Sequence, residues 1–328
     1  MLRIIHRFLL LLDPETAHHC GLRLLQLRQW FLFKVQKKKM LLKMGSLHVV
    51  GLPRISFKNR LGLAAGFDKN AEVFASLASF GFGFVEIGTV TPKPQPGNPK
   101  PRLWRLPGGA LRNQLGFNNL GVEAARRNLL RYRAHVWAVP IFANIGKGVN
   151  TPLEEALKDY ESAALALTDV VDGFVVNLSS PNTPGLRSLQ TETFLDALGK
   201  IIPKGFPALV KLAPDLEDEE SRKLAAQIGE SDHLAGLVLT NTSRALAESL
   251  DGAATGGVSG RPLFDRALQC VSLARENLKD KTLVGVGGVS CVAQAKAMRD
   301  AGADLVEIYT SFVYQGPRLV RELARALT

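Results

Sequence analysis

The sequence predicts an α/β fold, a (β/α)8 barrel with a small N-terminal helical extension. Eight short apolar segments recur through residues 46–328, and helical stretches separate most of them. Apolar runs without polar alternation are typical of parallel strands that are buried on both faces. Eight such units in a stretch of this length match a closed barrel. A doubly wound open sheet is the alternative fold.

The N-terminal extension, residues 1–45, carries +7 of the net charge of +11. The tripeptide Asp13-Pro14-Glu15 is typical of a helix start, with a capping carboxylate, a proline at the first position and an acid in the first turn. We therefore expect a short helix before it and a longer one to about residue 33. The longest apolar run, Phe8–Leu12, is too short to span a bilayer and a poor match to a secretory signal.

Leucine and phenylalanine alternate with basic residues along this segment. Such basic, amphipathic helices suit the interface of an anionic membrane. Two alternatives are helices that merely cover the core and a nucleic-acid-binding arm, although the abundance of Leu and Phe argues against the arm. We expect two parts, an amphipathic helical segment at 1–45 and a catalytic barrel at 46–328.

The barrel elements follow from the apolar runs and the helical periodicity. The expected strands are Leu61–Ala65, Phe84–Ile87, Ile141–Ile145, Phe174–Asn177, Ala208–Lys211, Gly236–Thr240, Leu283–Val286 and Leu305–Ile308. The clearest helices are Pro152–Thr168, Glu217–Ile228, Ala267–Leu278 and Val292–Ala301. Two connections differ from a minimal barrel. Residues 48–58 predict a hairpin that closes the bottom, and residues 89–118 predict a long Pro/Gly-rich loop without regular structure, which is typical of a functional segment.

The residues at the strand ends indicate the chemistry, because barrel active sites lie at the C-terminal ends of the strands. These ends are rich in Asn, Thr, Gly and Lys and contain neither His nor Cys. Carboxamides donate and accept hydrogen bonds, so several of them suit the edge of a neutral, imide-like ring. The composition argues against a carboxylate pair for glycoside hydrolysis and against a Ser/His/Asp set. For any single Asn or Thr, capping of the next helix is the alternative.

The last two strand ends indicate a phosphate site. Gly285-Val286-Gly287-Gly288 ends the seventh strand, and Tyr309-Thr310 follows the eighth. Loops after these two strands commonly bind phosphate in barrels, and glycines allow backbone N–H groups to approach an anion. A phosphate beside ring-binding residues favours flavin mononucleotide (FMN). The three cysteines and six histidines have no ligand spacing, so we expect no metal site.

Longer motifs carry a resemblance to a known family. In chain order they are LDPETAHH, GLAAGFDKN, GFGFVEIGTVTPKPQPGNPKPRLWRL, NQLGFNNLG, NIGKG, NLSSPNTPGLR, VKLAPDL, LTNT, TGGVSGRPL, GVGGV and YTSF. Together they resemble dihydroorotate dehydrogenase of class 2, the quinone-dependent, membrane-associated branch, over nearly the whole chain. The resemblance implies oxidation of dihydroorotate to orotate in pyrimidine biosynthesis, with one FMN per chain and a membrane quinone as acceptor. It also implies a peripheral location on the cytoplasmic face of a bacterial inner membrane.

The resemblance also implies roles for individual residues. Ser180 would be the base that removes the C5 proton of the substrate, while the C6 hydride passes to flavin N5. Class 1 enzymes use a cysteine as this base, and no cysteine lies near the NLSSPN segment of this chain. The substrate would contact Lys69, Asn113, Gln114, Leu115, Gly116, Phe117, Asn177, Asn182, Asn241 and Thr242. FMN would contact Ala65, Gly66, Phe67, Asp68, Lys69, Thr89, Asn144, Asn177, Lys211 and Thr240, and its phosphate Gly260, Gly288, Tyr309 and Thr310. The quinone would pass between the N-terminal helices, near His18 and Arg105.

Competing functions remain open on the sequence alone. One is a tRNA dihydrouridine synthase, which would need positive charge to contact phosphates, but the barrel body is nearly neutral. Such enzymes also favour a catalytic cysteine, which is not apparent here. We therefore expect no nucleic-acid partner. Others are a soluble dihydroorotate dehydrogenase that uses fumarate or NAD, and a membrane-bound flavoprotein without catalytic activity. Gln114 stands where many members of the family have Arg, so any role of that charge in holding its loop is in doubt.

Overall fold

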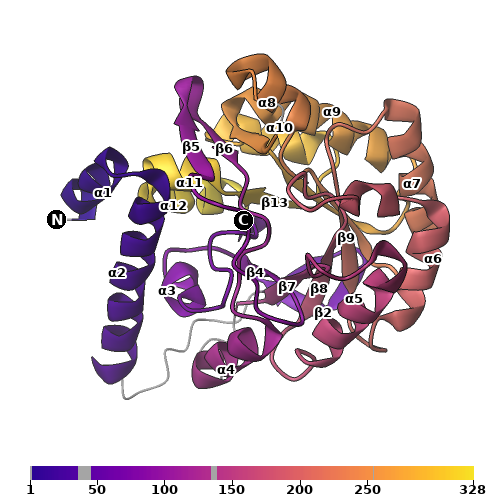
Figure 1. Ribbon diagram of the computed structural model, residues 1–328, viewed down its shortest axis with the longest axis horizontal. Coiled ribbons are helices and arrows are strands. Elements are labelled where there is room, and N and C mark those ends of the chain that lie inside the picture. Colours follow the sequence, from indigo (N-terminus) through magenta and orange to yellow (C-terminus); the bar gives the residue numbers. More distant parts are fainter. Residues whose placement is uncertain (1, 36–45, 134–138, 254) are drawn as a thin grey trace.

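The computed structural model describes residues 2–35, 46–133, 139–253 and 255–328, and at its centre lies a closed barrel of eight parallel strands (Figure 1). The barrel strands are β3 (Leu61–Leu63), β4 (Phe84–Val90), β7 (Ile141–Ile145), β8 (Gly173–Asn177), β9 (Ala208–Leu212), β10 (Gly236–Leu239), β12 (Thr282–Val286) and β13 (Leu305–Ile308). The prediction of a (β/α)8 barrel is confirmed, and the open sheet is wrong because β13 pairs with β3 and closes the ring.

The strand boundaries differ from the predicted ones by a few residues. β3 ends at Leu63, and the N–H of Ala65 instead donates to a carboxylate oxygen of Glu86, 3.0 Å away, inside the barrel. β10 ends at Leu239, so Thr240 belongs to the following loop. Parallel pairing brings the mouth residues into register, with Asn177 beside Lys211 and Gly88 beside Asn144. These pairings place polar strand ends from distant parts of the chain side by side.

Helices cover the outside of the barrel. They are α3 (Phe74–Ala78), α4 (Val122–Arg133), α5 (Ala156–Leu165), α6 (Glu192–Ile201), α7 (Asp218–Glu230), α8 (Arg244–Asp251), α9 (Phe264–Arg275), α10 (Val292–Asp300), α11 (Thr310–Gln315) and α12 (Pro317–Ala326). The four predicted helices correspond to α5, α7, α9 and α10. The N-terminal part of the first one is a 3-10 turn, Leu153–Glu155, and α9 begins three residues earlier than predicted.

The predicted hairpin is confirmed as β1 (Leu47–Val49) and β2 (Leu52–Phe57), which pair antiparallel. Its buried side chains share a hydrophobic cluster with inward-facing residues of the barrel strands. The Phe57 ring meets that of Phe84 edge to face, with ring centroids 5.8 Å apart. The hairpin therefore closes the bottom of the barrel with an apolar layer, and the polar residues of the interior gather at the other end.

The prediction of a structureless loop at 89–118 is wrong in its second half. β5 (Leu103–Leu106) and β6 (Ala110–Asn113) form a hairpin, and β11 (Gly257–Gly260) adds a third antiparallel strand. The guanidinium of Arg112 lies over the Trp104 ring, 3.8 Å from its centroid. Pairing with β11, about 150 residues further along the chain, orders this segment. Figure 1 shows β5 and β6 standing out from the barrel on the side of the N-terminal helices.

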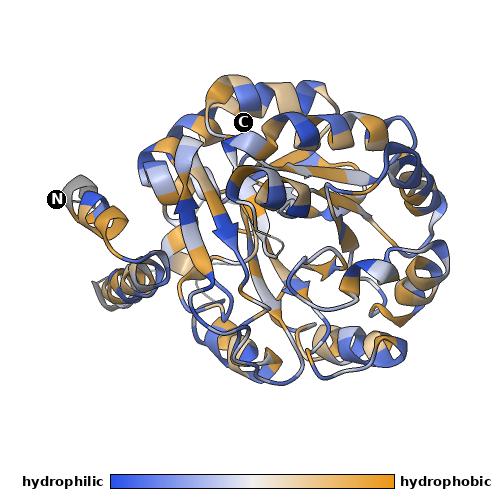
Figure 2. Cartoon of the chain, turned by 45° about the horizontal axis from the view of Figure 1, so that its top comes forward, coloured by the Kyte–Doolittle hydropathy of each residue, from blue (hydrophilic) through white to orange (hydrophobic). Residues whose placement is uncertain are grey.

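Two helices precede the barrel, α1 (Leu2–Leu11) and α2 (Pro14–Val35). The predicted cap is confirmed, since the N–H of Thr16 donates to Asp13 Oδ1 at 3.0 Å. Figure 2 shows both helices set to one side of the barrel. Large apolar side chains remain exposed on them: Phe8 (65%), Leu11 (80%), Leu27 (65%) and Phe31 (60%). The basic run from Lys37 to Lys43 lies outside the described residues. Within the described ranges no helix has the length and apolar character needed to cross a membrane.

Candidate functional site

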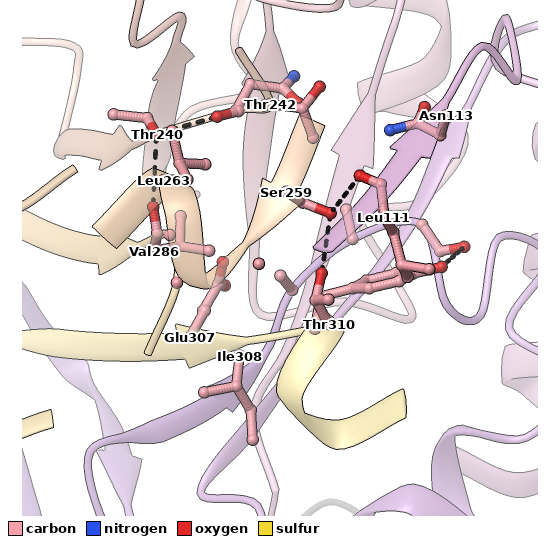
Figure 3. Close-up of a pocket in the computed structure, with 18 of the residues that line it drawn as sticks. Leu111, Asn113, Thr240, Thr242, Ser259, Leu263, Val286, Glu307, Ile308 and Thr310 are labelled. Carbon is pink, nitrogen blue, oxygen red and sulfur yellow. Dashed lines mark hydrogen bonds between the residues drawn. The ribbon is translucent and has the colours of Figure 1, made fainter. Parts of the chain in front are cut away.

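A cavity of about 390 Å³ opens at the C-terminal ends of the barrel strands, the size of a small-molecule or cofactor site. Loops after the strands form its walls, and the sheet of β5, β6 and β11 borders one side. Figure 3 shows Ser259 of that sheet hydrogen-bonded to Thr310 of α11, Asn113 further along the sheet, and Thr240, Val286 and Glu307 along the barrel wall. Residues from nearly every strand therefore meet around one space.

A buried charge cluster forms the floor of this cavity. Lys211 of β9 donates to Glu86 of β4 at 3.2 Å, and its Nζ lies 3.9 Å from a carboxylate oxygen of Glu307 of β13. Burial alone would lower the pKa of Lys211, but the two glutamates outweigh it and raise that pKa. Burial, and then the neighbouring Glu86, raise the pKa of Glu307 well above its usual range. The floor of the cavity thus combines a buried ammonium with two glutamate side chains.

A chain of hydrogen bonds connects this cluster to the cavity mouth. Asn144 donates to Glu86 Oε1 at 2.6 Å and accepts from the Thr89 hydroxyl. Asn177 donates to Asn144 Oδ1 at 3.2 Å, and Asn241 donates to Asn177 Oδ1 at 3.3 Å. Because Glu86 can only accept, it fixes the orientation of the first amide, and each bond fixes the next.

Unpaired polar atoms surround Ser180, which is itself buried. Its Oγ accepts the backbone N–H of Asn182 at 3.2 Å, and the Asn182 amide donates to Asn113 Oδ1 at 2.9 Å. Within the described residues, Asn182 Oδ1 and Thr242 Oγ1 are buried without a hydrogen-bond partner. An unsatisfied buried polar atom costs about 1–3 kcal/mol, so a bound molecule with polar edges would remove this cost.

The opposite end of the cavity combines glycines with hydroxyl groups. Gly287 and Gly288 follow β12 with φ of +146° and +70°. A Cβ at Gly288 would lie 2.6 Å from the backbone N of Phe264, so a side chain does not fit there. Ser259 and Thr310 share a hydrogen bond of 2.8 Å, and Ser311 Oγ is buried without a partner among the described residues. Hydroxyls and exposed backbone are the groups that suit a phosphate.

Most of the residues that the sequence suggested meet around this cavity. Those that line it are Ala65, Gly66, Lys69, Thr89, Asn113, Leu115, Gly116, Phe117, Asn177, Ser180, Asn182, Lys211, Thr240, Asn241, Thr242, Gly260, Gly288, Tyr309 and Thr310. Asn144 lies one layer beneath, where it connects Thr89 to Glu86.

Besides Asn144, three of the residues suggested for the flavin or the substrate lie outside the cavity lining. The Gln114 side chain accepts a hydrogen bond from Thr255 at 3.2 Å. The Phe67 ring packs against Phe312 and His18, with centroids 5.2 Å and 5.3 Å away. Asp68 is fully buried and accepts the backbone N–H groups of the residues that begin the next turn, and burial raises the pKa of its carboxyl to about 7. Phe67 and Asp68 therefore shape the backbone loop that lines the cavity.

A second, smaller cavity adjoins the first and lies against α2. Lys69, Leu103, Leu115 and Tyr309 line both cavities, and His18 lines the second one. Burial lowers the pKa of Lys69 to about 8, and the charge of Arg102 adds to this effect. Lys69 is therefore a cation between two connected spaces at neutral pH.

Arg105, suggested beside His18, does not line the second cavity in the described part of the chain. Its guanidinium donates to the backbone carbonyl of Leu12 at 2.5 Å and to that of Leu9 at 3.4 Å. These carbonyls lie at the C-terminal end of α1, where a cation is favourable. In this structure Arg105 thus fastens α1 to β5.

Glu86 and Glu307 were not recognised from the sequence. Each stands in the middle of an otherwise apolar run, Val85-Glu86-Ile87 and Val306-Glu307-Ile308, whose flanking residues alone predict a strand. An acid within a strand that is buried on both faces requires a partner inside the barrel. A glutamate in such a strand therefore indicates a buried polar cluster. Lys211 at the end of its strand could then have been assigned as the partner. Among the described residues, no group of three or more His, Cys, Asp or Glu side chains is arranged to hold a metal ion.

The comparisons with known proteins agree on one family. The sequence profile of the dihydroorotate dehydrogenase family matches residues 48–328. The "Dihydroorotate dehydrogenase (quinone)" of Thermus thermophilus is 44% identical, with 98% of this chain and 95% of that protein covered. The protein of the same name from Coxiella burnetii is 41% identical, covering 99% and 96%. The solved structure of ligand-free DHODH from Eimeria tenella has a TM-score of 0.82 and 34% identity, covering 96% of this chain and 94% of that one.

The pKa of His18 gives a testable dependence of stability on pH. Burial, followed by the charge of Lys69, lowers the pKa of His18 to about 3, whereas an unfolded histidine titrates near 6.5. Below pH ~6.5 the unfolded chain binds a proton that the folded chain does not, so stability falls as the pH falls toward 3, by at most about 1.4 kcal/mol per pH unit. We expect His18→Asn to remove this component from urea midpoints measured between pH 7 and 5.

His233→Asn is the matched control, because His233 is exposed and lies in the segment before β10. It should retain the pH slope of the wild type. Equal slopes for the wild type and His18→Asn would contradict the assignment.

Proposed function

The chain belongs to the dihydroorotate dehydrogenase family, and from that premise we propose that it oxidises dihydroorotate to orotate, a step of pyrimidine biosynthesis, and passes the electrons to a quinone. Relatives named for the quinone reaction match nearly the full length of the chain. The observation that carries the proposal is the shared cavity, in which Ser180, the asparagine amides and Lys211 face one space.

The family is flavin-dependent, and we assign FMN as the flavin. Its phosphate would be held by Gly260, Gly288, Tyr309 and Thr310. The hydroxyl groups and glycines at this end of the cavity support that role, as does the unpaired Ser311 Oγ. The rest of the cofactor would contact the residues suggested above from the loops after β3, β4, β7, β8, β9 and β10. When bound, FMN accepts a hydride from the substrate and delivers the electrons to the quinone.

Dihydroorotate would bind beside Ser180. Its ring amides match the Asn113, Asn182 and Asn241 carboxamides, which can each donate and accept. The buried, unpaired Asn182 Oδ1 and Thr242 Oγ1 would gain partners from the substrate. Its carboxylate would be balanced by the ammonium of Lys69, which lines the same cavity.

Ser180 would act as the base that removes the C5 proton of the substrate. A serine hydroxyl is a weak base and requires help from its surroundings. The Asn182 N–H that donates to Ser180 Oγ favours negative charge developing on that oxygen. The cation of Lys69 at the same cavity adds to this effect.

A quinone would approach through the second cavity, which shares four lining residues with the first. Within its lining, which also includes Glu15, Lys69 and Glu72, the uncharged His18 imidazole and the apolar Leu22 and Leu103 side chains would contact the quinone ring. The exposed apolar residues of α1 and α2 would rest on the membrane in which a quinone dissolves. This feature favours a peripheral membrane location over a soluble dehydrogenase, and we propose the cytoplasmic face of a bacterial inner membrane as that location.

Substitution of Ser180 tests the proposed base. In Ser180→Ala we expect the rate of flavin reduction by dihydroorotate, measured anaerobically by stopped flow, to fall ~10²-fold or more. The exposed Ser188 of the same loop provides a control, and Ser188→Ala should react at the wild-type rate. A wild-type rate in Ser180→Ala would remove Ser180 from this role.

Substitutions on α2 test the membrane contact. Leu27→Gln combined with Phe31→Gln should weaken binding to phosphatidylglycerol-containing vesicles at least tenfold, since each buried apolar side chain contributes about 1.5–3 kcal/mol. The control is Leu165→Gln with Leu250→Gln, two residues of similar exposure (58% and 51%) on barrel helices. Vesicle sedimentation measures both. Equal loss of binding in the two double variants would argue against a specific contact through α2.

A further inference from the structure

Three loops of the cavity wall converge on one side chain, Arg187. We infer that Arg187, together with Asp215, is a positioning residue that holds the Ser180 peptide at the correct place over the substrate site. The inference rests on the proposed function, because it concerns how the base is held for that reaction. It assigns Arg187 no contact with the substrate or the flavin.

The guanidinium of Arg187 uses each of its nitrogens for a different loop. Nε donates to the Ser179 carbonyl at 3.0 Å, in the loop after β8. Nη1 donates to Asp215 Oδ2 at 2.7 Å, after β9, and Nη2 donates to the Thr242 carbonyl at 3.1 Å, after β10. One planar group thus sets the spacing of three consecutive strand ends.

The contact with Ser179 acts directly on the proposed base. The Ser179 carbonyl belongs to the peptide unit whose nitrogen is that of Ser180, and this unit is planar. When the carbonyl is held, the plane that leads into Ser180 is held as well. Arg187 itself is fixed by the buried Leu186 and Leu189 on either side of it in a short 3-10 turn. The segment 179–187 is therefore a loop tied together at its base.

The contact with Thr242 connects this loop to the substrate side of the cavity. Thr242 carries a buried hydroxyl without a partner in the described structure, and we have assigned that hydroxyl to the substrate. Because Arg187 holds both the Thr242 carbonyl and the Ser179 carbonyl, it sets the distance between the base and a substrate-binding residue. A shift of about 1 Å in such a distance can cost ~10²-fold in rate.

Asp215 orients the guanidinium and is itself held from two other sides. Its Oδ1 accepts the Ser243 hydroxyl at 2.5 Å, and its Oδ2 accepts the backbone N–H of Arg244 at 2.9 Å. Burial raises the pKa of Asp215, but these hydrogen bonds and Arg187 together lower it below its ordinary value. Asp215 therefore carries its negative charge at neutral pH and makes the bond to Arg187 charge-assisted.

A lysine at position 187 distinguishes the effect of the positive charge from the effect of the three hydrogen bonds. An ammonium keeps the positive charge but cannot reach three acceptors in one plane. Arg187→Lys therefore preserves the electrostatics around Asp215 while it loses the link between the loops.

Arg275, the last residue of α9, provides a matched control. It makes the same kind of fork, with Nε to the Gly302 carbonyl at 3.0 Å, Nη1 to the Lys279 carbonyl at 2.9 Å and Nη2 to Asp304 Oδ2 at 2.6 Å. These acceptors precede β12 and β13, at the end of the barrel opposite the cavity. Arg275→Lys thus removes a comparable network that does not join the loops around Ser180.

The experiment compares Arg187→Lys and Arg275→Lys as full-length, flavin-loaded proteins. With saturating dihydroorotate under anaerobic conditions, we expect the limiting rate of flavin reduction to fall ~10- to 100-fold in Arg187→Lys. The substrate dissociation constant and the rate of reoxidation by a quinone analogue should stay within about threefold of the wild type. Arg275→Lys should match the wild type in all three quantities. Equal slowing of both half-reactions by Arg187→Lys, or no slowing at all, would overturn the proposal.

A second readout does not depend on turnover. Amide hydrogen exchange of residues 178–190 should accelerate in Arg187→Lys and remain unchanged in Arg275→Lys. Asp215→Asn should reproduce this change if Arg187→Lys fails to fold, and unchanged exchange in the variant that folds would overturn the proposal. If the wild-type protein is not reduced by dihydroorotate, the proposed function fails, while the exchange result still decides whether Arg187 ties the loops.

Discussion

The buried contact between Lys211 and the two glutamates, Glu86 and Glu307, is the constraint on which the site depends. Charges inside a barrel cost several kcal/mol each unless they are paired and hydrogen-bonded. Here the three side chains come from β4, β9 and β13. Lys211 donates to Glu86 at 3.2 Å and lies 3.9 Å from Glu307, whose Oε2 has no hydrogen-bond partner within the described residues. Loss of one partner would leave an uncompensated charge in the core, so the cluster fixes these strands relative to each other and sets the polarity of the cavity floor. The hairpin of β1 and β2 fills the opposite end with apolar side chains, which leaves the mouth as the polar end.

The position of each functional group follows from this floor. Glu86 orients Asn144, and the amide of Asn144 begins the chain of hydrogen bonds that reaches Asn241 at the mouth. In our proposal that chain presents carboxamides to the flavin and to dihydroorotate, while the planar peptide before Ser180 is held from outside by Arg187. Lys69 stands where the two cavities meet. This arrangement supports an enzyme in which substrate and quinone reach the same flavin from separate sides.

The parts of the structure that depend on local sequence were predictable. The eight strands were found from their apolar runs, and the cap at Asp13 follows from its own tripeptide. The parts that depend on distant pairing were not. β6 is a strand because β11, far along the chain, lies beside it. Glu86 and Glu307 become meaningful once Lys211 is known to share the interior with them. The resemblance suggested Arg105 for the quinone. Its contacts with the carbonyls of α1 depend on how α1 packs beside β5, which the sequence does not show.

The most direct test of the account follows electrons through the purified protein. The protein should carry one bound FMN, whose absorbance is lost within the turnover time when dihydroorotate is mixed in anaerobically. A second mixing with a quinone analogue should restore the absorbance, with orotate formed in a one-to-one ratio to the flavin. A protein whose bound flavin stays oxidised in the presence of dihydroorotate, or whose reduced flavin does not react with the quinone, would contradict the account.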